Sequence, residues 1–319
     1  MNQVMQMALM SDSPIPLLGG VARRPGWLRG APGEIPLDIL PPLRYNTKKE
    51  ELIMQNFQSI DNNASFDWGR TSENYARFRD IYPASFYEKL RRLGIGLPGQ
   101  HVLDLGTGTG VLPRAMQGSG ARFTGVDITP NQLAQAQELS RGMDIEYVLS
   151  PVEEIDFSPG TFDAAMACQC FHYFDRAKVM PKIHEALKPG GRFAILMMAW
   201  LPYQSKICMQ SEKLVLKYNP GWTGGGLRRK NRWEQRASTK LKWAKPLFTV
   251  EKRVFYCEDI PFTRESWHGR MVACRGIGAS SLPDEKIAAF EAEHRAYLET
   301  LPEEFTIPHQ IMMLVLKKA

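Results

Sequence analysis

From about residue 100 onward, short apolar runs alternate with stretches in which apolar residues recur at helical spacing. Short apolar runs bounded by polar residues or glycine are typical of strands. Segments whose apolar residues recur every three or four positions are typical of helices. Strands that alternate with helices predict a parallel, doubly wound sheet. The strands predicted in this part of the chain cover residues 101–105, 121–128, 144–149 and 161–167.

The C-terminal part continues this pattern with longer insertions. Residues 192–200 form an apolar run typical of a strand buried on both faces, and residues 248–256 and 311–316 predict two more strands. Helices are predicted between them, the second starting at Thr263. These helices cover residues 203–218, 263–275 and 283–298. Two insertions, at about 201–246 and 260–300, therefore interrupt this half of the sheet.

Residues 1–55 differ in kind from the rest of the chain. Their prolines and scattered glycines offer neither a period nor an apolar core. We therefore expect a disordered or irregular N-terminal extension, followed by one domain over residues 56–319. Met54 is a candidate for the true start of the protein.

The composition predicts a reduced, cytoplasmic protein. The chain shows no secretory signal and no run of the ~20 apolar residues that a bilayer span requires, so we expect no membrane insertion. Its five cysteines lack the paired spacing of a zinc site, and we expect no metal. They are Cys168, Cys170, Cys208, Cys257 and Cys274. The sequence indicates no oligomeric state.

The turn after the first predicted strand is the most informative segment. Asp104 ends the strand, and Gly106, Gly108 and Gly110 follow at alternate positions before a helix. Glycine lets the backbone approach a ligand closely, but a pyrophosphate would be repelled by the acid, and the dinucleotide fingerprint places its third glycine at Val111. The ammonium and sulfonium of S-adenosylmethionine would instead be attracted. A purely structural tight turn is the alternative.

The next predicted strand also ends in an acid. Asp127 follows the glycine turn by about 20 residues, the spacing that a βαβ unit produces. Its two oxygens could accept hydrogen bonds from the hydroxyls of a ribose. The alternative is a helix-start residue before Thr129 and Pro130, which are themselves good helix openers.

The ordered series of motifs resembles the class I S-adenosylmethionine-dependent methyltransferases. The series consists of residues 102–110, Gly125-Val126-Asp127, Phe162-Asp163 and Leu187-Lys188-Pro189-Gly190-Gly191-Arg192. It is most similar to the small-molecule branch that includes trans-aconitate and ubiquinone-type methyltransferases, over about residues 66–319. The resemblance implies a Rossmann-like, seven-stranded sheet, mostly parallel with one antiparallel strand, with helices on both faces and helical lid insertions. It also implies an enzyme that uses S-adenosyl-L-methionine.

The resemblance implies roles for specific residues. Gly106, Thr107 and Gly108 would line the methionine part of the cofactor, and Asp104 would orient its ammonium. The ribose and adenine would be contacted by Asp127, Ile128 and Gln132. Ser150-Pro151-Val152-Glu153 stands where many relatives have Gly-Asp-Ala-Glu, so one expected adenine contact is missing. The backbone N–H of Val152 would still contact adenine, and Glu153 would replace the missing acceptor.

An N-terminal lid is implied as well. Tyr75 and Arg79, four residues apart on one helix face, would cap the cofactor, and Arg79 would pair with the cofactor's carboxylate. The alternative is an amphipathic helix in which the tyrosine packs and the arginine is solvated.

Chemistry is expected just after the fourth strand, at residues 168–174, because ligands bind outside the carboxyl ends of parallel strands. Gln169 is a further candidate for cofactor binding. His172 is the candidate general base, although it could simply hydrogen-bond the loop. The Asn/Asp-Pro-Pro-aromatic motif of nucleic-acid amino-methyltransferases is absent from this segment, which argues against base methylation. Methylation of a metalloid through Cys168 or Cys170 is a minor alternative.

The insertions are expected to select the methyl acceptor. Residues 201–245 hold eleven Lys or Arg residues against two Glu residues, a local excess that would attract acidic metabolites or RNA. We expect a small-molecule acceptor, with an acidic or aromatic metabolite as the leading class. An RNA methyltransferase and a non-catalytic cofactor-binding subunit are the alternatives. The candidate acceptor residues are Tyr173, Trp200, Trp222, Trp267 and Arg270.

Overall fold

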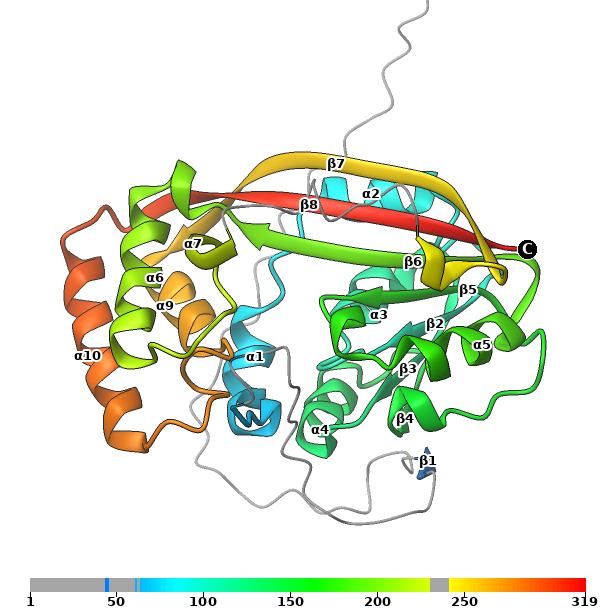
Figure 1. The fold of residues 1–319 in the computed structure, drawn as a ribbon, viewed down its shortest axis with the longest axis horizontal. Helices are drawn as coiled ribbons and strands as arrows, with labels where there is room; N and C mark the ends of the chain where they lie inside the picture. The colour runs from blue at the N-terminus through cyan, green and yellow to red at the C-terminus, as the bar shows by residue number, and fades with distance from the viewer. Residues whose placement is uncertain (1–43, 46–60, 62–63, 230–240) are drawn as a thin grey trace, which may run out of the picture. The chain divides into compact units, whose positions relative to one another are not determined.

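The computed structural model describes residues 44–45, 61, 64–229 and 241–319. These residues build an eight-stranded sheet with the strand order β1-β4-β3-β2-β5-β6-β8-β7 (Figure 1). Neighbours from β1 to β6 are parallel, whereas β8 runs antiparallel to both β6 and β7. The strands are β1 Arg44–Tyr45, β2 His101–Leu105, β3 Arg122–Asp127, β4 Ile145–Leu149, β5 Phe162–Cys168, β6 Leu187–Trp200, β7 Phe248–Thr263 and β8 Glu304–Lys318.

This topology confirms the predicted fold class, a mostly parallel sheet in which β8 is antiparallel. The two-residue strand β1, which pairs with β4, adds an eighth strand to the seven predicted. The rest of the predicted extension over residues 1–55 lies outside the described residues, and its irregular character stays a prediction.

The last two strands are much longer than the apolar runs that predicted them. β7 and β8 pair along their whole length, from Phe248 opposite Lys318 to Thr263 opposite Glu304. Along most of β7, exposed and partly buried residues alternate with few apolar anchors, so hydrophobicity alone did not reveal the full strand. The helix that follows β7 starts directly after it, at Arg264.

Helices cover both faces of the sheet. Alternate residues of β2 point to opposite sides, so Val102 packs with α2 and α3 in one apolar cluster and Leu103 packs with α5 in another. No helix within the described ranges is long and apolar enough to cross a membrane. The helices are α1 Ser72–Phe78, α2 Ala84–Arg92, α3 Val111–Met116, α4 Pro130–Leu139, α5 Arg176–Ala186, α6 Lys206–Tyr218, α7 Gly226–Arg229, α9 Arg264–Val272 and α10 Asp284–Glu299.

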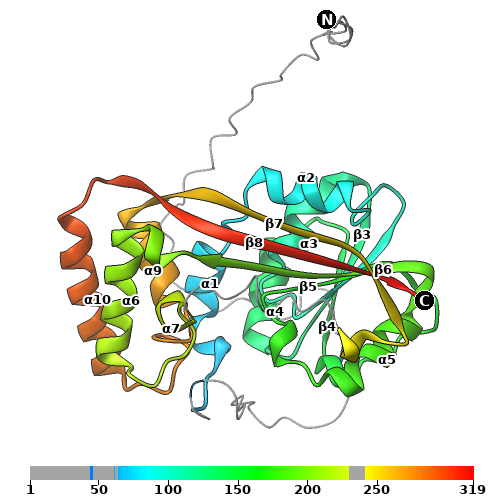
Figure 2. The same cartoon turned by 45° about the horizontal axis from the view of Figure 1, so that its top comes forward.

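The helices of the two insertions form one group at the far ends of β6, β7 and β8. Both views show α6, α9 and α10 side by side there (Figures 1 and 2), and α9 also contacts α1. α9 begins where predicted, because the side chain of Thr263 accepts from the backbone N–H of Ser266 in a capping box. The long strands therefore carry these helices beyond the parallel part of the sheet.

Trp267 anchors this helical group. Its side chain is completely buried, and its indole N–H donates to Ser211 Oγ of α6 at 2.9 Å. The ring meets Trp200 and Phe262 edge-on, at centroid distances of 5.7 and 5.0 Å. On the other side of the hydrogen bond, His294 Nε2 of α10 lies 2.9 Å from the same Ser211 oxygen. Trp267 thus joins the insertions to the ends of β6 and β7.

Truncation of this anchor should destabilise the protein. We expect Trp267→Ala to lower the free energy of unfolding by about 3–5 kcal/mol, because it leaves a cavity and removes one hydrogen bond from the buried hydroxyl of Ser211. Urea denaturation measures the change. Val250→Ala, on an exposed part of β7, is the control and should stay within about 0.5 kcal/mol of the wild type. A loss below about 1 kcal/mol for Trp267→Ala would contradict the anchoring role.

Candidate functional site

A cavity of ≈ 480 Å³ opens at the carboxyl ends of the parallel strands. Its wall includes residues that come one or two positions after the ends of four of these strands. In open α/β sheets this edge is where ligands bind. The residues that follow β2, β3, β4 and β5 in this wall are Gly106, Ile128, Pro151 and Gln169.

The turn between β2 and α3 has the backbone that its glycines predict. Gly106, Gly108 and Gly110 all have left-handed φ angles, of 64°, 58° and 69°. A Cβ atom at Gly110 would lie 2.2 Å from Tyr147 Oη, and one at Gly106 would lie 2.8 Å from Cys170 Sγ. Conformation and space therefore both require glycine at these two positions.

Asp127 ties this turn to the end of β3. Its Oδ2 accepts from the backbone N–H of Gly108 at 2.8 Å, and its Oδ1 accepts from that of Thr129 at 2.9 Å. Burial raises the pKa of Asp127, and the hydrogen bonds from the backbone oppose that rise. Each carboxylate oxygen can accept a further hydrogen bond, so the group can hold ligand hydroxyls as well as the turn.

Asp104 is more deeply buried than Asp127 and does not line the large cavity. Together with Thr107 it lines a second, small cavity of ≈ 20 Å³, which shares Tyr75, Arg79 and Gly106 with the large one. Asp104 Oδ2 accepts from the Thr107 hydroxyl at 2.6 Å. Burial raises the pKa of Asp104 to about 7, and the hydrogen bond from Thr107 opposes that rise. A cationic ligand group beside Asp104 would stabilise its ionised form.

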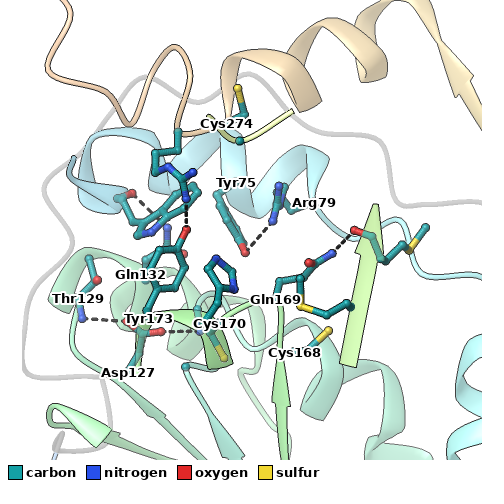
Figure 3. A pocket seen from close by; sticks show the side chains of 18 of the residues that line it. Tyr75, Arg79, Asp127, Thr129, Gln132, Cys168, Gln169, Cys170, Tyr173 and Cys274 are labelled. Carbon is teal, nitrogen blue, oxygen red and sulfur yellow. Dashed lines mark hydrogen bonds between the residues drawn. The ribbon is translucent and has the colours of Figure 1, made fainter. Parts of the chain in front are cut away.

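Tyr75 and Arg79 line the large cavity beside the glycine turn, and a Cβ atom at Gly108 would lie 3.6 Å from Tyr75 Cε1. Arg79 Nη2 donates to Tyr75 Oη at 3.3 Å, and the guanidinium lies 4.6 Å from the centre of the Tyr75 ring. Figure 3 shows this pair in the upper part of the pocket and Asp127 in the lower part. Trp68, which the sequence analysis missed, meets Tyr75 edge-on and also lines the cavity.

The residues expected near adenine and ribose also line this cavity. Ile128, Val152, Glu153 and Gln132 all belong to its wall. Gln132 Nε2 donates to the carbonyl of Trp68 at 3.1 Å, and Glu153 Oε1 accepts from the backbone N–H of Asp175 at 2.9 Å. One oxygen of Glu153 is therefore already used within the protein.

The segment after β5 supplies the middle of the cavity. Gln169 has a left-handed φ of 63° and donates from its side chain to the carbonyl of Met198. The thiols beside it serve structural contacts: Cys168 donates to Tyr82 Oη at 3.2 Å, and Cys170 donates to the carbonyl of Leu105 at 3.0 Å. Burial raises the pKa of Cys168 to about 12. This thiol is therefore protonated at neutral pH and is a poor nucleophile.

His172 and Tyr173 lie next to each other in the cavity wall, with ring centroids 4.0 Å apart. Tyr173 Oη accepts from Arg275 Nη1 at 2.6 Å (Figure 3), and Arg275 in turn forms a buried ion pair with Asp61. Asp61 also accepts from the backbone N–H of Thr223 at 2.6 Å. Asp61 and Arg275 are 214 residues apart, and no local pattern indicates their pairing.

The acceptor candidates divide into two groups. Tyr173, Trp200, Trp222 and Arg270 line the cavity, together with Met197 and Met198, which the sequence analysis did not single out. Trp267 does not line it, because its ring is buried in the core between Trp200 and Phe262. The prediction that Trp267 contacts the acceptor is therefore wrong, because its side chain points from α9 into the core.

The predicted basic surface is only partly described. Residues 230–240, which hold four of the eleven basic residues of the first insertion, lie outside the described residues. Binding of RNA by this surface stays a prediction. Within the part of the chain that the structure describes, no cluster of His, Cys, Asp and Glu could hold a metal ion.

The pH dependence of stability should report the burial of Asp104. An acid whose pKa is about 7 in the folded chain and 3.8 in the unfolded chain contributes its full stability below about pH 4, and this contribution is lost progressively as the pH rises from about 4 to about 7. We expect the wild type to lose about 1.4 kcal/mol per pH unit relative to Asp104→Asn between about pH 4 and 7. Urea denaturation across this range measures the difference. Asp144→Asn, at an exposed acid, is the control, and parallel profiles for wild type and Asp104→Asn would contradict the assignment.

Comparison with known proteins gives a consistent result. Residues 103–195 match a family described as "Methyltransferase domain". The chain is 34% identical over 129 residues to a ubiquinone biosynthesis O-methyltransferase of Pseudomonas aeruginosa, covering 39% of this chain and 54% of the relative. The same enzyme of Pseudomonas entomophila is 30% identical over 160 residues, covering 49% of this chain and 68% of the relative. The chain spans about half the length of several curated relatives that it matches.

Among solved structures, the geranyl diphosphate C-methyltransferase of Streptomyces coelicolor aligns with 74% of this chain and 79% of its own. The TM-score is 0.41 and the identity 18%. The alignment at 30% identity over more than two thirds of the Pseudomonas entomophila relative is stronger. On that alignment, the chain belongs to the class I S-adenosylmethionine-dependent methyltransferases, the family that its motif series predicts.

Proposed function

We propose that this protein transfers a methyl group from S-adenosylmethionine to a small-molecule acceptor. The observation that carries the proposal is the clamp between Asp127 and the glycine turn, at one end of a cavity that continues to Trp200 and Arg270. Its volume of ≈ 480 Å³ lies within the range of small-molecule sites, roughly 300–1,000 Å³. One end would hold the cofactor and the other would hold the acceptor.

The residues present fit this cofactor chemically. Asp127 keeps acceptor capacity for two ribose hydroxyls, and the left-handed turn at Gly106 and Gly108 lets the backbone approach a ligand. Asp104 would face the ammonium, and Arg79 would pair with the carboxylate. Val152, Ile128 and Gln132 would surround the adenine, with one oxygen of Glu153 as a polar contact.

When bound, the cofactor supplies a methyl group on a positively charged sulfur. The acceptor atom forms a bond to the methyl carbon while the carbon–sulfur bond breaks, and sulfur keeps that electron pair. The protein's share is to align the acceptor with the methyl group and to exclude water. The apolar wall of Met197, Met198 and Trp222 serves that purpose at the acceptor end.

His172 is the proposed base for acceptors that must lose a proton. It lines the cavity beside Tyr173 and two residues from Cys170. The ion pair of Arg275 with Asp61 holds Tyr173 through its hydroxyl, and Tyr173 in turn packs against the imidazole. This arrangement fixes where His172 can receive a proton.

Cofactor binding provides the first test. We expect the purified protein to bind S-adenosylmethionine in calorimetry and Asp127→Ala to bind it at least about tenfold more weakly, since hydrogen bonds to a charged group are lost. Asp144→Ala, which removes an exposed acid, should bind like the wild type. Absence of binding by the wild type, or equal binding by Asp127→Ala, would refute the proposed cofactor site.

The role of His172 requires an acceptor, which a screen of cell extract with methyl-labelled cofactor can identify. We expect labelled material that resists ribonuclease; label found only in ribonuclease-sensitive material would favour the RNA alternative. With that acceptor, His172→Ala should lower the turnover rate by about 10²–10⁴-fold and remove the acidic limb of the pH profile. An unchanged rate across neutral pH would exclude His172 as the base.

A further inference from the structure

Arg270 is a buried arginine without an anionic partner among the described residues. It lies in α9, lines the large cavity and is only 4% exposed. Its Nε and Nη1 atoms are buried and have no hydrogen-bond partner. The guanidinium makes a cation–π contact with Trp200, whose ring centre lies 4.6 Å from the guanidinium carbon. A buried charge is costly unless it is paired, so this site calls for an anion.

The other two arginines of the cavity are already engaged. Arg275 forms an ion pair with Asp61, and both side chains are more than 90% buried. Arg79 donates to Tyr75 and, under the proposed function, pairs with the carboxylate of the cofactor. Arg270 therefore differs from both: it is as buried as Arg275, but it lacks an acid such as Asp61.

Glu212, the acid that accepts a hydrogen bond from Trp200, is engaged by other donors. Glu212 is completely buried, and its carboxylate accepts from the indole N–H of Trp200 and from the backbone N–H groups of Gly226 and Leu227. No hydrogen bond joins this carboxylate to Nε or Nη1 of Arg270. Burial, and then the nearby charge of Arg79, lower the pKa of Arg270 to about 9, as expected for a cation that has no compensating anion.

We propose that the methyl acceptor carries a carboxylate and that Arg270 binds this group against the face of Trp200. This inference rests on the proposed function and names its substrate class: an apolar or aromatic monocarboxylic acid. Arg270 carries one positive charge, which one carboxylate on the acceptor would neutralise. The planar N–H donors of its guanidinium fit the two oxygens of a carboxylate. Met197, Met198 and Trp222 line the same cavity and would contact the apolar part of the acid.

The carboxylate also balances the charge of the whole site. S-adenosylmethionine brings two positive groups and one negative group. In the proposed arrangement its carboxylate is paired with Arg79 and its ammonium with Asp104, which leaves the sulfonium and Arg270 positive. An anionic acceptor would lie between two cations, and both would lower the free energy of its binding. A neutral acceptor would leave Arg270 unpaired.

The experiment measures acid binding separately from cofactor binding. Wild-type protein is first titrated with S-adenosylhomocysteine, and the complex is then titrated with benzoate, phenylacetate and octanoate and with the neutral amide of each. We expect at least one acid to bind ten times or more tightly than its amide, since a charge-assisted pair is replaced by a neutral one. The variants are Arg270→Met, Arg270→Lys and, as a matched control on exposed surface, Arg295→Met.

We expect Arg270→Met to bind S-adenosylhomocysteine within about threefold of the wild type, which shows that it is folded, and to bind the acid about 30- to 100-fold more weakly. Arg270→Lys should recover part of that loss, because it keeps the charge but not the planar pair of donors. Arg295→Met should behave like the wild type. Binding of the amide should barely change in any variant.

Two results separate this inference from the proposed function. If the wild type binds S-adenosylhomocysteine but prefers none of the acids to its amide, or if Arg270→Met keeps the preference, the carboxylate inference is overturned and the cofactor site stands. If the wild type does not bind S-adenosylhomocysteine, the proposed function fails. Titration of the free protein with the acids then still tests Arg270 as an anion site.

Discussion

The pairing of β8 with β6 on one side and β7 on the other is the constraint on which the site depends. Trp200 at the end of β6 lies opposite His309 of β8, and Thr263 at the end of β7 lies opposite Glu304. α9 starts directly after Thr263 and carries Arg270, so the ladder brings Arg270 and Trp200 together. Without this rigid pairing, the second insertion would have no fixed position relative to the strand ends.

Buried groups of opposite charge lie in and beside the cavity wall. Two buried acids, Asp104 and Asp127, flank the glycine turn, and burial raises the pKa of both. Arg270, beside the indole ring of Trp200, belongs to the wall of the same cavity. A buried acid gains from a cationic or hydroxyl ligand, and a buried arginine gains from an anion. These buried groups support the proposal that the cavity takes two ligands of different charge.

Much of this could be predicted from the sequence because the relevant signals are local. The strand-turn-helix of residues 101–116 needs only an apolar run and glycines whose φ angles are left-handed, and Asp127 follows at the spacing of one βαβ unit. The sequence did not predict the full length of β7, because this length depends on pairing with β8 more than on the hydrophobicity of β7 itself.

The errors and omissions concern contacts between distant parts of the chain. Trp267 and Arg270 share a helix face, and only the packing of α6 and α10 decides that Trp267 belongs to the core while Arg270 lines the cavity. The pairing of Asp61 with Arg275 spans 214 residues and has no local signature. Side chains of this kind acquire their roles only from tertiary structure.

The separation of the two ends also has an evolutionary consequence. The hydrogen bonds of the glycine turn run among Asp104, Thr107, Gly108 and Asp127, and none of them involves β7, α9 or α10. Mutations in the helices carried by the long strands can therefore accumulate without cost to the turn. Under the proposed function, a change at a few side chains such as Arg270 would alter which acceptor is bound, while the hydrogen bonds of the glycine turn would stay in place.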